Sequence, residues 1–194
     1  MKAEPVALAG RKVLLCVCGG IAAYKSADLV RRLRDAGATV QVAMTENAQR
    51  FVGAQTFQAL SGLPVRSSLW DEAAEQAMGH LELARWADGI VVAPATANTI
   101  AKLAQGFADD LVSTLCLATT APITIAPAMN HRMWLNPATQ ANVETLRARG
   151  VRIVGPVDGP LAEGESGPGR LSEPAQIVAA LVLRQAQDER ESQR

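Results

Sequence analysis

The stretch KVLLCVCGG (residues 12–20) decides the fold class. Its apolar residues follow one another without alternation, which is typical of a strand buried on both faces of a parallel sheet. Two glycines end the run. A pattern with helical spacing follows, in which Ala22, Ser26, Leu29 and Leu33 share one face. The segment therefore predicts a buried strand, a tight turn and a helix.

The same alternation continues along the chain. Further strand-like runs cover residues 39–45, 65–69, 89–94, 122–127 and 151–154. Helical patterns cover residues 46–60, 80–88, 98–119, 137–149 and the segment that begins at 173, whereas the polar residues 71–79 predict a loop. Strands that alternate with helices across short loops predict an α/β fold, a Rossmann-like or flavodoxin-like doubly wound parallel sheet with helices on both faces. We expect one domain over residues 11–183, with flexible tails at residues 1–10 and 184–194.

The composition argues against several classes of function. The 194 residues include 19 Lys and Arg and 19 Asp and Glu, so net charge gives no reason to expect nucleic acid or an anionic membrane as a partner. No apolar run reaches the length of about 20 residues that a membrane-spanning helix needs, and the first apolar stretch is too short for a signal peptide. We therefore expect a cytoplasmic protein. Three cysteines and two histidines, without a Cys-x-x-Cys pair, predict neither a disulfide framework nor a metal site.

In an open parallel sheet, ligands bind beyond the carboxyl ends of the strands. The segment Gly19-Gly20-Ile21 follows the first predicted strand, where glycine lets a ligand approach the backbone and a helix amino terminus favours negative charge. It is neither Gly-x-Gly-x-x-Gly nor a Walker loop, so it predicts neither NAD nor ATP. A plain tight turn would explain the same glycines.

Two other strand ends carry polar side chains. Thr96, Asn98 and Thr99 place donors at a predicted helix start, which suits a phosphate or a polyol, although simple helix capping by Asn98 or Thr99 would explain them too. Residues 127–134 (PAMNHRMW) follow a buried strand, and Asn130 there could bind a carboxylate or an amide. The two methionines and the tryptophan of this segment could wall a flat cofactor, or belong to the ordinary core.

The chain has only two histidines. His80 begins a predicted helix, whose amino terminus would keep the imidazole neutral and able to accept a proton. A structural or merely exposed histidine is the alternative for His80, and for His131 as well.

Five motifs, each beside a predicted strand end, resemble those of the flavin-containing cysteine decarboxylases. Within that family they are most similar to the enzymes that act on phosphopantothenoylcysteine in coenzyme A synthesis. The motifs are GGIAAYK at 19–25, HLELARWAD at 80–88, PATANT at 94–99, PAMN at 127–130 and GPGR at 167–170. The resemblance covers residues 11–181, nearly the whole chain, with the motifs in the family's order.

The resemblance implies FMN as the cofactor and no metal. Ten residues would contact the flavin, at its ring or along its ribityl chain and phosphate: Gly19, Gly20, Ile21, Thr45, Thr96, Ala97, Asn98, Thr99, Ala128 and Met129. His80 would be the catalytic base, and Asn130 would bind the substrate carboxylate. Met133, Leu161 and Ala162 would also contact the substrate. The segment PLAEGESGPGR (residues 160–170) would form a flap over it.

The resemblance also implies partners. The family's flavin lies between subunits, so a homotrimer or a dodecamer of trimers is expected. The bifunctional relatives continue into a phosphopantothenate-cysteine ligase domain, which makes such a domain or a separate ligase an expected partner. The small-molecule substrate would be 4'-phosphopantothenoylcysteine.

The chain departs from the family pattern at one position of the flap. The reductive members carry Ala-Cys-Gly, whose cysteine protonates the enethiol in the last step, whereas this chain has Ala162-Glu163-Gly164. We predict that Glu163, an acid of suitable reach, is the proton donor. Alternatively, the last step is lost and an enethiol is released, as in relatives that oxidatively decarboxylate a peptide C-terminal cysteine. A non-catalytic, flavin-binding regulatory subunit is a third interpretation. A flavin prenyltransferase would lack the His80 and PAMN arrangement.

Overall fold

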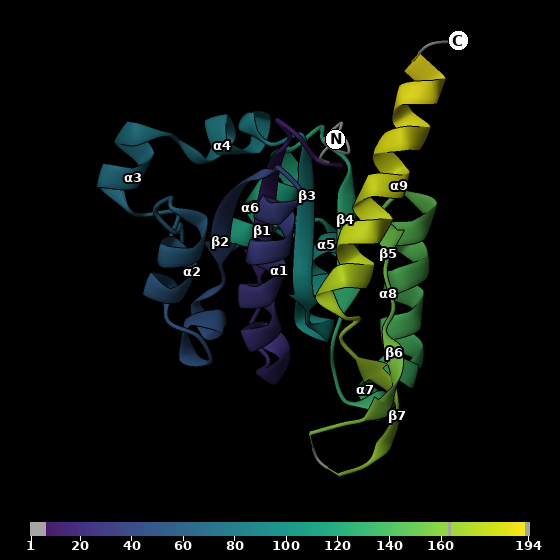
Figure 1. Ribbon diagram of the computed structural model, residues 1–194. Helices are drawn as coiled ribbons and strands as arrows, with labels where there is room; N and C mark the ends of the chain where they lie inside the picture. Colours follow the sequence, from purple (N-terminus) through teal and green to yellow (C-terminus); the bar gives the residue numbers. More distant parts are fainter. Residues whose placement is uncertain (1–6, 163, 193–194) are drawn as a thin grey trace.

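The computed structural model describes residues 7–162 and 164–192, and Figure 1 shows their arrangement. Five parallel strands form one sheet in the order β2-β1-β3-β4-β5. They are β1 (Lys12–Val17), β2 (Thr39–Met44), β3 (Gly89–Ala95), β4 (Ile123–Pro127) and β5 (Arg152–Ile153). This flavodoxin-like order confirms the predicted fold class and puts the topological switch point between β1 and β3.

Helices cover both faces of the sheet, as Figure 1 shows. One layer contains α1 (Lys25–Asp35), α2 (Ala54–Ser61) and α9 (Pro174–Ser192). The opposite layer contains α4 (His80–Trp86), α5 (Ala97–Gln105), α6 (Leu111–Ala118) and α8 (Pro137–Ala148). Because successive side chains of a strand point to opposite faces, β1 divides its residues between two cores. Leu15 packs with Leu29 and Leu33 in one core, and Leu14 packs with Leu115 in the other.

Several predicted boundaries differ from the observed ones. Residues 46–60 form a short 3-10 helix, η2 (Glu46–Arg50), followed by α2, rather than one helix. Residues 98–119 belong to two helices, because Gly106 ends α5 with a φ of 77° and Asp110 caps the start of α6. Residues 65–69 contribute a single bridge, between Arg66 and Ala43, and not a strand.

The segment predicted as a loop at 71–79 contains a helix, α3 (Glu72–Ala77), just before α4. Its sequence, EAAEQA, is rich in good helix formers, which outweighed the polar character on which the loop prediction rested. Between β1 and α1 lies a further 3-10 turn, η1 (Ile21–Tyr24).

After β5 the chain forms an antiparallel hairpin of β6 (Val157–Pro160) and β7 (Ser166–Arg170). The hairpin lies against α7 (His131–Leu135), at the bottom of Figure 1. The backbone N–H of Met129 donates to the carbonyl of Gly169 at 2.9 Å. A Cβ on Gly169 would lie 2.2 Å from the Met129 carbonyl oxygen, so only glycine allows this close approach. The predicted flap is therefore a hairpin docked on the segment that follows β4.

Within residues 7–162 and 164–192, no helix combines the length and the apolar character that crossing a bilayer requires. The last helix, α9, extends to Ser192. The domain limits of 11–183 stay a prediction.

Candidate functional site

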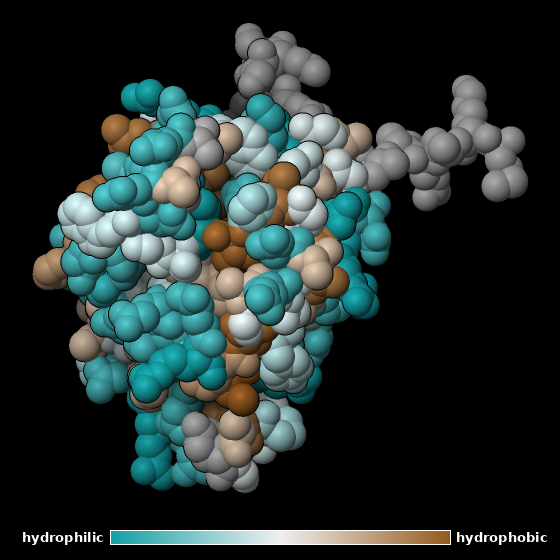
Figure 2. All heavy atoms as spheres, turned by 90° about the vertical axis from the view of Figure 1, so that its left-hand side faces the viewer, coloured by the Kyte–Doolittle hydropathy of each residue, from teal (hydrophilic) through white to brown (hydrophobic). Residues whose placement is uncertain are grey.

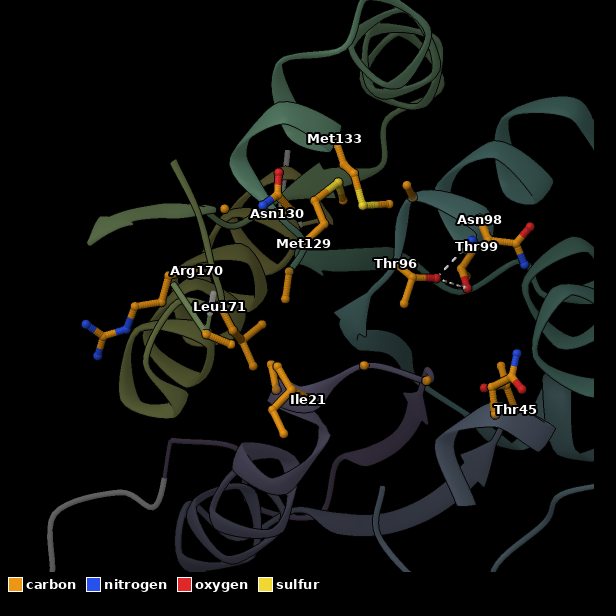
Figure 3. Close-up of a pocket in the computed structure, with 18 of the residues that line it drawn as sticks. Ile21, Thr45, Thr96, Asn98, Thr99, Met129, Asn130, Met133, Arg170 and Leu171 are labelled. Atoms are coloured by element: carbon orange, nitrogen blue, oxygen red, sulfur yellow. Dashed lines mark hydrogen bonds between the residues drawn. The ribbon is translucent and has the colours of Figure 1, made fainter. Parts of the chain in front are cut away.

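A cavity of about 860 Å³ lies beyond the carboxyl ends of the parallel strands, and Figure 3 shows it in close-up. Its walls come from the segments that follow four strands and from the β6–β7 hairpin. The segments are residues 19–22 and 24–25 after β1, 45–47 after β2, 96–99 after β3, 128–130 with Met133 after β4, and 160–162 with 169–171 from the hairpin and its end. This is where an open parallel sheet is expected to bind a ligand.

All ten residues predicted to contact a flavin line this cavity, and so do the four predicted to contact the substrate. The cavity therefore brings together four of the five motifs, which lie far apart in the sequence. Their roles stay predictions. Two of the three predicted catalytic residues are not among the lining residues: His80, which lies elsewhere, and Glu163, which is outside the described part of the chain.

One end of the cavity is rich in hydroxyl groups. The Oγ1 of Thr96 accepts from the backbone N–H of Thr99 at 3.2 Å and lies 3.1 Å from the Thr99 hydroxyl. Thr96 is thus the N-cap of α5, a role that the sequence interpretation gave to Asn98 or Thr99. Thr45 caps η2 in the same way, through Ala48. Figure 3 shows Thr45, Thr96, Asn98 and Thr99 on one side of the cavity.

The other end is more apolar, although Asn130 and Arg170 also lie there. Ile21, Met129, Met133 and Leu171 surround it in Figure 3. A cavity that is polar at one end and apolar at the other suits a ligand with a flat aromatic part and a hydroxylated, anionic chain.

The amide of Asn130 has a defined orientation. Asn130 is the N-cap of α7, and its Oδ1 accepts from the backbone N–H of Arg132 at 2.8 Å. Because the oxygen is engaged in this way, Nδ2 offers the donors, and one of them reaches Glu165 of the hairpin at 3.5 Å. Glu165 also lies 3.1 Å from Nη2 of Arg132 and 3.2 Å from Nδ1 of His131. A donor amide at the cavity wall is the group needed to bind a carboxylate.

The cavity wall carries a charged group that the sequence did not predict. Lys102 Nζ lies 2.8 Å from Asp109 and 2.7 Å from Asp110. Partial burial alone would lower the pKa of Lys102, but the two carboxylates outweigh it and raise the pKa. Asp110 also accepts from the backbone N–H of Ser113 at 2.8 Å, which completes a capping box on α6. In the sequence, the pattern Asp-x-x-Ser before an apolar run indicates this cap at Asp110, but it does not indicate the pairing with Lys102.

The three cysteines are buried free thiols in the core beside the cavity. Burial raises the pKa of Cys18 to about 12, so its thiol is protonated at neutral pH. The hydrogen bond with the Cys116 thiol raises the pKa of Cys16, and burial raises it further. Cys16 and Cys18 are therefore packing residues and not nucleophiles. In the part of the chain that the structure describes, no group of three or more metal-ligating side chains could hold an ion.

His80 lies outside the cavity of its own chain. It begins α4, which leads into the start of β3, whereas the cavity lies beyond the end of that strand. Figure 1 accordingly shows α4 near the upper end of the sheet and the hairpin at the lower end. The imidazole Nδ1 lies 3.0 Å from Oε2 of Glu75, a partner that the sequence analysis did not find.

Comparison with known proteins gives matches over most of the chain. The family described as Flavoprotein matches residues 1–185. The coenzyme A biosynthesis bifunctional protein CoaBC of Vibrio vulnificus is 57% identical over 172 residues, which cover 89% of this chain and 43% of that protein. The protein of the same name from Escherichia coli K12 is 57% identical over 177 residues, covering 91% of this chain and 44% of its own length. The chain thus spans less than half the length of these curated relatives.

Two solved structures are similar along their whole length. A mutant PPC decarboxylase complexed with pantothenoylaminoethenethiol is 31% identical with a TM-score of 0.80, and the match covers 91% of this chain and 98% of that one. SpaF, described as an FMN-dependent cysteine decarboxylase, is 34% identical with a TM-score of 0.79, and the match covers 92% and 99% of the two chains. The similarity therefore extends over about nine tenths of this chain.

Proposed function

This chain belongs to the Flavoprotein family, and on that premise we propose that it decarboxylates 4'-phosphopantothenoylcysteine to 4'-phosphopantetheine in coenzyme A biosynthesis. It acts as a carbon–carbon lyase with FMN as cofactor, and residues 11–183 form the catalytic domain. The observation that carries the proposal is the single cavity wall assembled from four motifs of the cysteine decarboxylases. The names of the CoaBC relatives support the pathway, and the PPC decarboxylase structure supports the substrate.

The cavity fits FMN. Its hydroxyl-rich end, with Thr45, Thr96 and Thr99, suits the phosphate and the ribityl chain, and its apolar end suits the ring. The turn at Gly19 and Gly20 has no side chains between the cavity and the backbone, so a ligand can approach closely. FMN supplies a two-electron oxidation of the substrate carbon that bears sulfur, and the return of those electrons after CO2 has left.

The substrate explains why oxidation is needed. Loss of CO2 from a cysteinyl carboxylate leaves a carbanion, and the acylated nitrogen of this substrate cannot form a Schiff base to stabilise it. A thioaldehyde at the β carbon accepts those electrons instead. His80 removes a proton as general base during the oxidation, Asn130 orients the carboxylate through Nδ2, and Glu163 returns a proton to the enethiol. Met133, Leu161 and Ala162 contact the rest of the substrate.

The position of His80 favours a shared active site. Since His80 lies outside the cavity of its own chain, the cavity would receive the partner subunit's His80 in a homotrimer, alone or within a dodecamer of trimers. Figure 2 shows apolar side chains gathered in a band down the side of the molecule where β2 forms the edge of the sheet. Trp70 is 88% exposed, and Leu81 and Leu117 are about half exposed, at 49% and 59%. Exposed apolar surface of this kind favours burial between subunits.

An anaerobic assay tests the activity. The FMN-loaded protein is incubated with 4'-phosphopantothenoylcysteine, and the product is identified by mass. We expect 4'-phosphopantetheine. A protein that shows no flavin spectrum after FMN addition would refute the cofactor, and an FMN-loaded protein without turnover would favour a regulatory subunit.

The alternative reaction has one observation in its favour, because Glu163 stands where the reductive relatives carry cysteine. If the product of the same assay is an enethiol, two hydrogens lighter than phosphopantetheine, the role of Glu163 as proton donor is wrong. Turnover of a peptide with a C-terminal cysteine would then support an oxidative peptide decarboxylase.

A further inference from the structure

Glu75 on α3 gathers three hydrogen-bond donors. Its Oε1 accepts from Nη2 of Arg66 at 2.8 Å. The backbone N–H of His80 lies 3.1 Å and 3.2 Å from the two carboxylate oxygens. Its Oε2 lies 3.0 Å from Nδ1 of the His80 ring. The carboxylate therefore binds both the backbone and the side chain of His80, the residue that we propose as the general base.

Arg66 holds Glu75 in place. Its side chain is only 8% exposed, and its Nη1 donates to the carbonyl of Met78 at 2.6 Å. Its backbone bonds to Val42 and Met44 of β2, so the guanidinium is anchored to the edge of the sheet. The result is a continuous chain of contacts from a rigid strand through Arg66 and Glu75 to the His80 imidazole.

The charge of Glu75 determines which ring nitrogen is protonated. Burial alone would raise the pKa of Glu75, but the hydrogen bonds from the His80 side chain and backbone, together with the charge of Arg66, outweigh burial and lower it. An ionised carboxylate can only accept hydrogen bonds, so the nitrogen that faces it must carry the proton. In the neutral ring, Nδ1 is then the donor and Nε2 keeps the free lone pair.

We propose that Glu75 is a positioning residue for His80, which fixes the Nδ1–H tautomer and the ring orientation so that Nε2 is the atom that accepts the proton. This inference rests on the proposed function, in which His80 is the general base. It adds the residue that prepares the base for its role, and it places that residue outside the cavity, on α3.

The substitution Glu75→Gln separates this role from simple packing. A glutamine has nearly the same shape but only one acceptor atom, and Arg66 offers only donors. The amide oxygen must therefore turn toward Arg66, which leaves the NH2 group facing Nδ1 of His80. An NH2 group requires an acceptor, so the ring should change to the Nε2–H tautomer, which cannot take up a proton at Nε2.

The experiment is 15N solid-state NMR of the histidine-labelled, FMN-loaded protein, combined with kinetics. With only two histidines in the chain, a His131→Asn variant assigns the signals. We expect the Nδ1–H tautomer in the wild type and the Nε2–H tautomer in Glu75→Gln. We expect kcat to fall by roughly 10- to 10⁴-fold, a range that extends from the loss of an orienting partner to a base held in the wrong tautomer, with KM and FMN content little changed. The matched control is Glu72→Gln, which removes an exposed charge from the same helix and should change neither quantity.

Several outcomes would overturn the proposal. An Nε2–H tautomer in the wild type would do so without any variant, even if Glu75→Gln failed to fold. A Glu75→Gln protein that keeps the Nδ1–H tautomer would also do so, whatever its activity. Failure of the proposed function looks different: a His80→Asn variant with wild-type kcat would refute His80 as the base, while the tautomer shift in Glu75→Gln would still be measurable.

Discussion

At position 19 a side chain would collide with the segment that follows β2. A Cβ there would lie 2.4 Å from Cβ of Asn47 and 2.8 Å from its carbonyl carbon. At the next position, Gly20, the nearest atom to a Cβ would be Cγ2 of Thr96 at 3.9 Å, an ordinary contact. The two adjacent glycines thus differ: Gly19 is required by packing between the ends of β1 and β2, whereas the structure has room for alanine at position 20.

This difference predicts unequal effects of two matched substitutions. Gly19→Ala should lower the free energy of unfolding by about 1–3 kcal/mol, the usual cost of overpacking. For a chain of this size that corresponds to a fall in Tm of about 2–4 °C for each kcal/mol. Gly20→Ala, measured by the same thermal denaturation of the apoprotein, should unfold close to the wild-type temperature. Equal Tm values for the two variants would contradict the packing argument.

For residues that follow strand ends, the sequence predicted their place at the cavity. For residues whose role depends on contacts between distant segments, it did not. Gly19, Thr96 and Asn130 follow buried strands. Because a parallel sheet gathers the carboxyl ends of its strands at one edge, their positions in the sequence were enough to predict that they lie close together. Glu75 gave no such signal, because its importance comes from Arg66 and His80, which are brought to it by the fold. Glu163 falls outside the described residues, and its role stays a prediction.

At the scale of elements, periodicity predicted the five strands of the parallel sheet and most helices but not the breaks between helices. Both α5 and α6 contribute apolar side chains to the same core, so the apolar pattern continues across Gly106 and Asp110. For the hairpin, the sequence predicts only a glycine-rich flap over residues 160–170. Its shape depends on the contact of Gly169 with Met129, which are 40 positions apart, and a local pattern cannot reveal such a contact.

The joint between α5 and α6 depends on Asp110, which caps α6 and pairs with Lys102 of α5. Burial alone would raise the pKa of Asp110, but the hydrogen bonds from Lys102 and Ser113 outweigh it and hold the pKa below the ordinary value of 3.8. A lowered folded-state pKa means that the ionised group stabilises the fold fully above pH 3.8. That contribution is lost as the pH falls from there through the folded-state pKa.

Two variants distinguish the contribution of the helix cap to stability from the contribution of the Asp110 charge. Asp110→Ala should lower the free energy of unfolding at pH 7 by about 1 kcal/mol for the lost cap, in addition to the loss of the Lys102 pair. Asp110→Asn keeps an acceptor for Ser113 and should lose less. Urea denaturation at neutral and acidic pH measures both, and the advantage of the wild type over Asp110→Asn should shrink only below pH 3.8. A pH-independent difference would show that the charge of Asp110 does not stabilise the joint.

At the scale of the whole molecule, the cavity and His80 belong to different regions of one chain. The family resemblance predicts that His80 and Asn130 act in the same site, but the motifs that carry it do not say which subunit contributes each residue. The flavodoxin-like order of strands explains the cavity but not the position of α4, which precedes β3 at the other end of the sheet. In the homotrimer or dodecamer that we propose, contact between subunits brings the two regions together, and no pattern along one chain specifies that geometry.

Mixed oligomers test this arrangement. His80→Asn and Asn130→Asp should each abolish turnover while FMN stays bound, because neither residue is among the ten predicted to contact the flavin. If each active site combines Asn130 of one subunit with the partner subunit's His80, equal co-expression of the two variants should restore about one quarter of wild-type activity, since half of the cavities and half of the neighbouring histidines are intact. The two variants mixed after separate assembly serve as the control and should stay inactive. Co-expressed oligomers without activity would place both residues in one subunit's site and would refute the shared active site.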